Sequence, residues 1–180
     1  TLRLSHNKTT IKSLDGSTSY IDQTNFPAPG SPGTATRLSA GGLVGAYYIH
    51  EYAGLDEDGK FVIYDNDGVK VYASDAKNDY KRYIGNAIPK LIASWDHTFQ
   101  YKNWDLSISL RSWIDYDVFN TINMYFGINV PNSGQNYLKR AFGKNKEIND
   151  SKHLNSFWLE DGTFLKIDAI NLAYRLNLKK

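Results

Sequence analysis

The stretch LIASWDHTFQYKNWDLSISLRSW, residues 91–113, alternates between two kinds of side chain with one short interruption. Apolar or aromatic residues occupy every second position up to Tyr101, and the alternation resumes at Trp104 after the Lys102-Asn103 pair. A repeat of two residues is the period of a β-strand. The stretch therefore predicts two strands joined by a two-residue turn.

A two-residue turn fixes the register of this hairpin, because it places Tyr101 opposite Trp104 and so determines every other pair. The register collects apolar and polar side chains on opposite faces. The apolar face carries Trp95, Phe99, Tyr101, Trp104, Leu106, Ile108 and Leu110, together with the His97 ring. The polar face carries Ser94, Asp96, Thr98, Gln100, Asp105, Ser107, Ser109 and Arg111.

Two environments suit a ribbon of this kind. In a soluble sandwich the apolar face packs on a second sheet, whereas in an outer-membrane barrel it meets lipid and the polar face lines the lumen. Each arm has about ten residues, the length of a tilted strand that crosses the hydrocarbon layer, while globular strands have about five or six. Length favours the barrel, and Tyr101 and Trp104 beside the turn fit an aromatic girdle.

Composition excludes several classes of function. The net charge of the 180 residues is +2, which gives no support for binding nucleic acid through bulk charge. The absence of cysteine excludes disulfides, thiolate catalysis and cysteine metal sites. The sequence contains no run of 18 apolar residues, so we predict no transmembrane helix. The mean hydropathy of −0.49 is compatible with a barrel, because alternating strands average their two faces.

The first part of the chain divides into a predicted loop and a strand region. Residues 1–40 are rich in Ser, Thr, Gly and Pro, with FPAPGSPG (26–33) as the strongest breaker, and we predict a loop. From Leu43 onward, β-forming segments alternate with the turns DEDG (56–59) and DNDG (65–68). These turns resemble the start of a calcium loop but lack its full ligand pattern, so we interpret them as hairpin turns.

The second part of the chain also combines a loop with a strand. Residues 114–155 predict a long polar loop with a short helical piece near residues 136–142. Strand patterning returns near the C-terminus, where the apolar phase contains Ile170, Leu172, Tyr174, Leu176 and Leu178. Short turns and long polar loops together are typical of an outer-membrane barrel.

Catalytic signatures are weak in this sequence. We find no nucleophile elbow, zinc-protease helix, phosphate-binding loop or dinucleotide fingerprint, and the four histidines are widely separated. The pairs Asp115/Asp117 and Glu160/Asp161 resemble glycosidase carboxylates, but acidic residues in surface turns are far commoner. We therefore predict no enzymatic activity, no cofactor and no metal.

The polar face offers candidate binding residues. If this face lines a lumen, Asp96, Ser109 and Arg111 belong to a polar wall. This wall contacts solute or a plug, or its polar groups bond to one another through a diagonal pair between Asp96 and Arg111. Trp113, Asp115 and Tyr116 follow at the strand end, and aromatic rings beside an acid are suited to stacking on sugars. Placement in an aromatic girdle explains Trp113 equally well.

Five segments resemble, in order, the C-terminal barrel region of the SusC/RagA family of TonB-dependent outer-membrane transporters of Bacteroidetes. The resemblance covers roughly residues 40–178. The segments are GLVGAYYIHEYAGLDEDG (42–59), YIGNAIPK (83–90), TFQYKNWDLSISLR (98–111), DVFN (117–120) and LEDGTFLKI (159–167). Relatives tend to have a glycine-rich stretch where this sequence reads RSWIDY (111–116), so the strand end is bulkier here.

The resemblance implies an all-β fold of antiparallel strands from a transmembrane barrel of about 22 strands, with long extracellular loops and short periplasmic turns. We expect residues 1–180 to be part of one barrel domain, with the plug, TonB box and signal peptide outside this chain. The implied function is TonB-powered import of oligosaccharides, or of peptides, across the outer membrane together with a SusD-like surface lipoprotein. The alternatives are a secreted β-sandwich that binds carbohydrate and, third, a glycoside hydrolase fragment.

Overall fold

The computed structural model describes residues 1–16, 18–23, 25–26, 33–130, 134 and 136–176. The chain forms two compact units. The first, which we call the sheet unit, consists of Thr1–Lys8, Ile88–Asp117 and Asp161–Lys180. The second, the core unit, consists of Thr9–Ala87 and Val118–Glu160.

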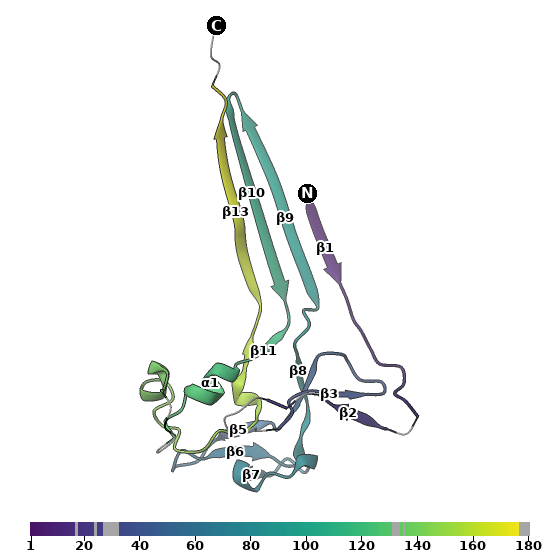
Figure 1. The fold of residues 1–180 in the computed structure, drawn as a ribbon, viewed down its shortest axis with the longest axis vertical. Coiled ribbons are helices and arrows are strands. Elements are labelled where there is room, and N and C mark those ends of the chain that lie inside the picture. Colours follow the sequence, from purple (N-terminus) through teal and green to yellow (C-terminus); the bar gives the residue numbers. More distant parts are fainter. Residues whose placement is uncertain (17, 24, 27–32, 131–133, 135, 177–180) are drawn as a thin grey trace. The chain divides into compact units, whose positions relative to one another are not determined.

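The sheet unit is one antiparallel sheet in the order β1-β9-β10-β13 (Figure 1). Its strands are β1 (Leu2–His6), β9 (Leu91–Tyr101), β10 (Trp104–Ile114) and β13 (Phe164–Tyr174). The last three strands have eleven residues each, about twice the usual length in globular proteins.

The structure confirms the predicted hairpin and its register. Tyr101 lies opposite Trp104, and the pairing continues without a shift along both strands. The turn is the Lys102-Asn103 pair, in which Lys102 has a φ of 53°. A positive φ at the first turn position is a feature of the two-residue turns that match strand twist.

A β-bulge changes the apolar phase of β13. The register shifts between Ser109 and Leu110, so Ala169 lies opposite Ser109 while Ile167 lies opposite Leu110, and Asp168 is the extra residue. Leu165 and Ile167 before Asp168 occupy odd positions, and Ile170, Leu172 and Tyr174 after it occupy even positions, yet all five share one face. The predicted phase from Ile170 is confirmed as far as Tyr174. Leu176 lies beyond β13, and Leu178 lies outside the described residues.

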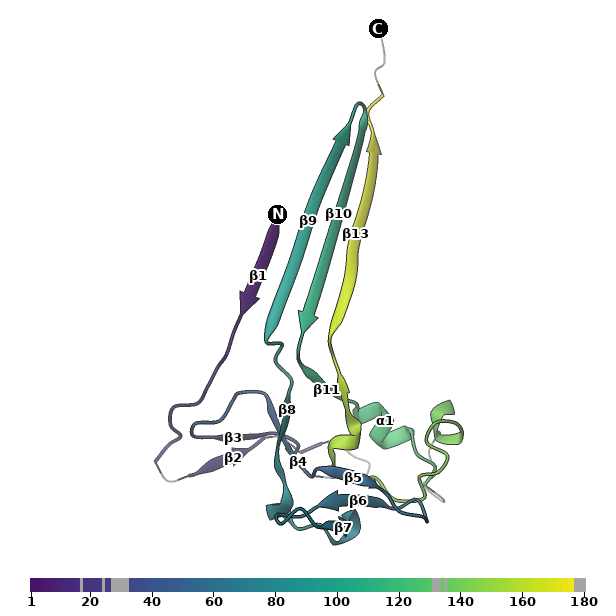
Figure 2. The ribbon, with the colours of Figure 1, turned by 180° about the vertical axis from the view of Figure 1, so that it is seen from behind.

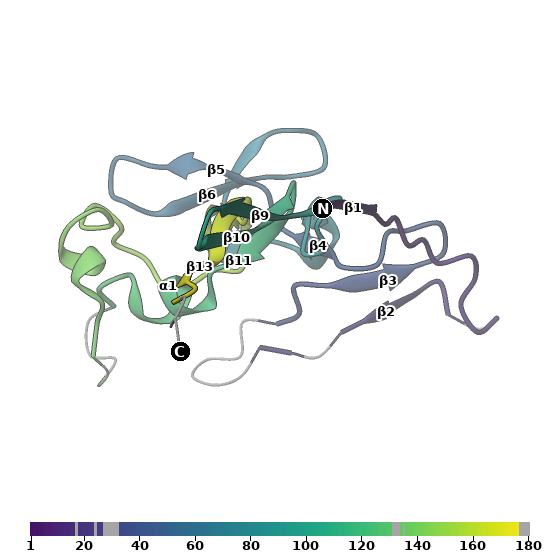
Figure 3. The ribbon, with the colours of Figure 1, turned by 90° about the horizontal axis from the view of Figure 1, so that it is seen from above.

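The core unit contains short strands (Figures 2 and 3). Buried side chains from these strands and the segments between them form its hydrophobic core. Three sheets lie in this unit: β2 (Tyr20–Asp22) with β3 (Arg37–Ser39), β4 (Ala46–Ile49) with β8 (Arg82–Asn86), and the meander β5 (Tyr52–Leu55), β6 (Phe61–Tyr64), β7 (Lys70–Tyr72). In addition, β11 (Asp117–Phe119) pairs with β12 (Leu159–Asp161). The helical elements are η1 (Ala73–Asp75), η2 (Asn78–Tyr80), α1 (Thr121–Phe126), η3 (Lys139–Phe142) and η4 (Ser156–Trp158).

The core of this unit joins segments that are distant in sequence. Phe61 and Ile63 of β6 are fully buried together with Trp158. The Phe61 and Trp158 ring centroids lie 5.7 Å apart. Met124 of α1 is also fully buried. Asn120 caps the start of this helix, because its side chain accepts a hydrogen bond of 2.8 Å from the Asn123 backbone.

Several predictions for loop regions need correction. The loop prediction for residues 1–40 is wrong at β1, β2 and β3, because their stability comes from strand partners that local composition does not reveal. In the second predicted loop, β11 and α1 were missed, whereas the helical piece near residues 136–142 is confirmed as η3. Most of the FPAPGSPG breaker, residues 27–32, lies outside the described residues.

Candidate functional site

Many side chains on the apolar face of the sheet unit are exposed among the described residues. Leu4 is 63% exposed, Ile170 is 60% exposed and Leu165 is 73% exposed, although all three belong to regular strands. Further exposed apolar or aromatic side chains of this face are Leu2, Phe99, Tyr101, Trp104, Ile167, Leu172 and Tyr174. The predicted residues Trp95, Leu106, Ile108 and Leu110 lie on the same face and are half-buried between neighbouring strands. Soluble proteins rarely expose such a continuous apolar surface, so this face requires a nonaqueous partner.

Aromatic rings gather at the turn end of the apolar face. The ring centroids of Trp104 and Tyr174 lie 4.7 Å apart, and Tyr101 lies opposite Trp104 in the hairpin. The Lys102 ammonium lies 5.3 Å from the centre of the Tyr101 ring. Rings with a polar end beside a lysine are typical of a strand end at a membrane–water boundary.

The His97 ring is part of the same apolar face. Its centroid lies 4.0 Å from the Phe99 ring and 5.3 Å from the Trp95 ring. The ring is thus packed along the strand, as predicted. Among the described residues, no group of three side chains is arranged to hold a metal ion.

The polar face is held together by interactions between neighbouring strands. Asp96 pairs with Arg3 of β1 and accepts a hydrogen bond of 2.6 Å from Ser109 Oγ. Arg111 instead pairs with Asp168, at 3.2 Å between Nε and Oδ2. The Asp96–Arg111 diagonal is therefore wrong, because β1 and the bulge of β13 supply closer partners.

This network extends along the full sheet. Arg175 donates two hydrogen bonds of 3.0 and 3.1 Å to the Asp105 carboxylate. Asn171 Nδ2 donates to Ser107 Oγ at 3.3 Å, and Lys166 Nζ lies 3.6 Å from Asp168. A polar face whose neighbouring strands are joined by ion pairs and hydrogen bonds is suited to lining a lumen or to contacting a plug.

The predicted strand-end residues come together as a packed aromatic cluster. Trp113 lies on the polar face, with its centroid 5.7 Å from Phe164 and 5.9 Å from Tyr116. The Tyr116 ring rests on Gly162, where an added Cβ would lie 2.5 Å from ring carbons. Sequence analysis missed Gly162 as a positioning residue, although the EDG segment contained it. Both predicted rings are half-buried.

Asp115 has an unusual backbone conformation at this strand end. Its φ is 59°, and its carboxylate lies 2.7 Å from Lys90 Nζ. Its backbone N–H donates to Thr163 Oγ1 at 3.1 Å. These contacts hold the corner where β10 ends.

The other acidic residues considered for catalysis or calcium binding also make local contacts. Glu160 accepts a hydrogen bond of 2.8 Å from Asn120. Asp161 accepts one of 2.8 Å from the Thr163 backbone, which lowers the pKa of Asp161. In the predicted DxDG turns, Asp56 and Asp65 each accept two backbone hydrogen bonds from residues of their own turn, and both turns are confirmed.

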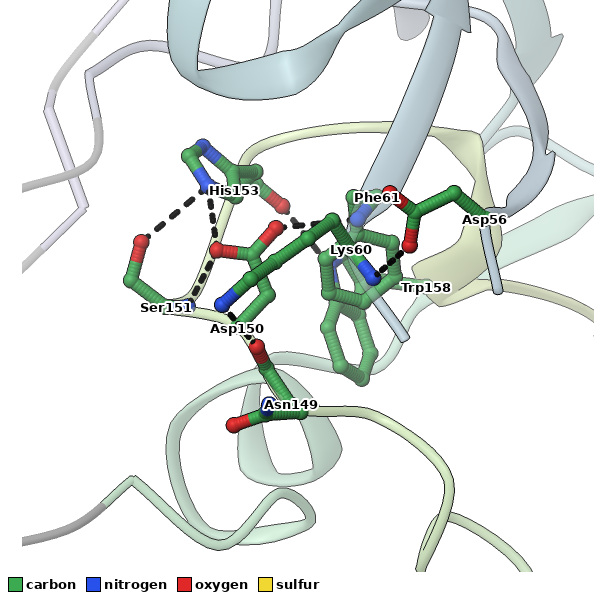
Figure 4. Close-up of polar contacts among 8 residues, drawn as sticks. All are labelled: Asp56, Lys60, Phe61, Asn149, Asp150, Ser151, His153 and Trp158. Atoms are coloured by element: carbon green, nitrogen blue, oxygen red, sulfur yellow. Dashed lines mark hydrogen bonds and ion pairs between the residues drawn. The ribbon is translucent and has the colours of Figure 1, made fainter. Parts of the chain in front are cut away.

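Asp150, Ser151 and His153 form a cluster that superficially resembles a catalytic triad (Figure 4). Both Asp150 Oδ1 and Ser151 Oγ contact the same ring nitrogen, His153 Nε2, at 3.3 and 3.0 Å. A triad base needs its two nitrogens between acid and nucleophile. Asp150 Oδ2 also accepts from the Phe61 backbone at 2.9 Å, so the cluster clamps the β5–β6 hairpin.

Comparison with known proteins identifies similar chains. The chain is 22% identical to TonB-dependent receptor P3 of Formosa agariphila over 186 aligned positions, which cover 92% of this chain and 18% of the receptor. The chain resembles a segment of a TonB-dependent receptor. No family model matches it.

A solved structure gives the fold. The structure of the RagAB peptide importer in the "closed-closed" state matches with a TM-score of 0.72 and 21% identity, over 96% of this chain and 20% of that chain. The all-β prediction is thus confirmed: the antiparallel strands match part of the transporter's β-barrel, and the barrel is not closed within this chain. The chain spans about a fifth of the length of these two proteins.

Both similar proteins are named as a receptor and an importer, not as enzymes. No helix among the described residues has the length and apolar character needed to cross a membrane.

Proposed function

We propose that the chain forms part of the wall and loops of a SusC/RagA-type TonB-dependent importer in the outer membrane. One observation carries this proposal: strands of eleven residues form a two-faced sheet whose apolar face is exposed. Eleven residues rise about 36 Å, which projects to about 28 Å at a tilt near 40°. That span fits the hydrocarbon layer of about 30 Å.

In this proposal the two faces have different roles. Phe99, Leu106 and Ile170 contact lipid, and the turn at Lys102-Asn103 lies on the periplasmic side. The ion-paired face that includes Asp96 and Arg111 lines the lumen and contacts solute or a plug. The predicted loop regions contribute to the extracellular side, where residues of long loops normally lie.

The proposed partners complete the importer. The remainder of the barrel pairs with the sheet edges at β1 and β13, since exposed edges within lipid leave backbone groups unsatisfied. TonB acts through a plug outside this chain, and a SusD-like lipoprotein assists solute capture. The solute is an oligosaccharide or a peptide. The naming of one similar protein as a peptide importer supports transport as the activity and keeps the peptide alternative open.

The sandwich alternative has less support. It requires a second sheet packed against the face of Phe99 and Leu106. Phe99 is instead 48% exposed, and nothing in the described part of the chain covers that face. A hydrolase has no support from the carboxylates discussed above, which make structural contacts.

Uptake by living cells tests the proposal. Labelled oligosaccharide and peptide mixtures are offered to cells with the intact gene, to cells without it and to cells without TonB. We expect uptake of at least one solute class to be lost in both deletion strains and to return on complementation. Uptake that is equal in all strains would contradict the proposed function.

Uptake also tests the polar wall within the intact protein. Asp96→Ala and Arg111→Ala are expected to reduce transport, whereas Lys144→Ala at an exposed site of the core unit serves as the control. Unchanged uptake and folding in both wall variants would leave that wall without a transport role.

A further inference from the structure

A basic pocket of about 250 Å³ lies in the core unit. Four of its lining residues are basic: His50, Lys81, Lys152 and His153. Among the described residues that line it, none is acidic. The pocket thus brings together positive or ionisable groups from three separate parts of the chain.

The two lysines are half-buried, and Asp22 is the carboxylate whose charge acts on Lys81. Within the described chain, neither ammonium makes an ion pair or a hydrogen bond. Burial lowers the pKa of Lys81, and the nearby Asp22 is engaged by Arg37 through hydrogen bonds of 2.6 and 2.9 Å. Lys152 Nζ contacts only the Tyr125 ring, at 5.2 Å from its centroid. Partly buried charges are normally paired, so a counter-charge is missing from this pocket.

Two histidine rings shape the pocket. The His50 ring nitrogens lie 3.0 Å from the Lys77 carbonyl oxygen and 3.3 Å from that of Leu154. Burial lowers the pKa of His50. His153 Nε2 is held by Asp150 and Ser151, and Figure 4 shows the second ring nitrogen turned away from both. Among the described residues that nitrogen has no hydrogen-bond partner, and the Asp150 carboxylate lies 3.3 Å from Nε2 on the other side of the ring.

We propose that this pocket binds an oxyanion, a carboxylate or sulfate carried by the solute, with Lys81 and Lys152 as its counter-charges. A hydrogen bond between an ammonium and an oxyanion is roughly twice as strong as one between neutral groups. Pockets for drug-sized ligands measure about 300–1,000 Å³, so this smaller pocket fits a single acidic sugar ring or one terminal amino acid. Assigning the oxyanion to a transported solute rests on the proposed function, whereas binding itself does not.

Calorimetric titration of the full-length protein in detergent, at low ionic strength, tests the pocket. The sugar probes are galacturonate, galactose 6-sulfate and neutral galactose; the peptide probes are trialanine and its C-terminal amide. We expect at least one acidic probe to bind ten-fold or more tightly than its neutral counterpart. Tight binding of the sugar acids identifies a saccharide ligand, and tight binding of trialanine identifies a peptide terminus. Equal binding of charged and neutral probes, or no binding of any, would overturn the proposal.

Variants locate the binding to this pocket. Lys81→Met and Lys152→Met keep the aliphatic stem and remove the charge, and each is expected to weaken oxyanion binding about ten-fold or more. Lys81→Arg should retain binding within a few-fold, and Lys144→Met at an exposed site should leave it unchanged. If Lys81→Met fails to fold, Lys152→Met decides the result. Equal weakening by Lys144→Met would overturn the assignment.

The uptake assay separates this inference from the proposed function. If the unmodified protein shows no preference for the acidic probes while uptake is intact, the pocket alone is rejected. If acidic probes bind but no uptake depends on TonB, the proposed importer function alone is rejected.

Discussion

Replacing Ile170 by arginine distinguishes a lipid-facing sheet from a water-facing one. Ile170 lies opposite Ile108 near the middle of β13, four residues before the strand ends at Tyr174. It is 60% exposed in the chain itself. In water, arginine at such a site would change stability by no more than about 0.5 kcal/mol.

A membrane changes this expectation strongly. The four intervals to the end of β13 correspond to about 13 Å along the strand, or about 10 Å along the bilayer normal at a tilt near 40°. Ile170 therefore lies close to the midplane of the proposed span, where arginine costs about 2–4 kcal/mol. At Tyr174, beside the interface, the cost falls to about 0–1 kcal/mol.

Urea unfolding of the full-length protein in phospholipid vesicles measures these differences. We expect Ile170→Arg to lower the free energy of unfolding by about 2–4 kcal/mol. Tyr174→Arg and Asn171→Arg, which lie near the interface and on the opposite face, should each cost about 1 kcal/mol or less. A stability for Ile170→Arg within about 0.5 kcal/mol of the wild type would refute the lipid-facing assignment.

Three further predictions concern packing and charge. Gly59→Ala should lower the free energy of local unfolding, measured by hydrogen exchange, by about 1–3 kcal/mol more than Gly68→Ala. Both glycines have a φ near +78°, but only a Cβ added at Gly59 would meet a backbone oxygen, at 2.0 Å. Equal effects would contradict that close contact. Hydrogen bonds from Arg37 hold the pKa of Asp22 below its ordinary 3.8. The Asp22–Arg37 pair therefore stabilises the folded state fully above pH 3.8, and this stabilisation is lost as the pH falls through the lowered pKa. Asp22→Asn should remove this part of the acid dependence of local exchange, and an unchanged acid profile would count against it. Gly162→Ala should destabilise the protein by about 1–3 kcal/mol, and Tyr116→Ala should remove most of that penalty in a double-mutant cycle by thermal unfolding; additive effects would contradict the contact.

The central hairpin could be predicted from sequence because its information is local. Alternation over two arms and a two-residue turn define a single register, from Trp104 opposite Tyr101 onward. The same local logic correctly identified the DxDG turns, whose Asp side chains bond within four residues of their own position.

Features set by distant pairing could not be predicted in the same way. Leu2–His6 forms a strand because β9 offers it an edge more than eighty residues away. The bulge at Asp168 requires knowledge of which strand lies beside β10, although the shift of apolar residues from odd to even positions was a visible sign. The true partners of Asp96 and Arg111 follow from these two features, which explains why the predicted diagonal was wrong.

The strand-end cluster was predicted in identity but not in arrangement. Trp113 and Tyr116 were correctly placed near one another at the end of β10. Their half-buried packing depends on Phe164 and Gly162, which approach from β13 and the turn before it. These contacts could not be predicted, because Phe164 and Gly162 are distant in sequence from Trp113 and Tyr116.

Spin labelling of the two faces in bilayers tests the central claim most directly. The absence of native cysteine allows single cysteines at Phe99, Leu106, Thr98 and Ser107 of the full-length protein without background labelling from this chain. A lipid-facing sheet predicts strong collision with oxygen at positions 99 and 106, with positions 98 and 107 shielded from lipid. Protection of positions 99 and 106 from both lipid and water would show a buried protein core and contradict the membrane wall.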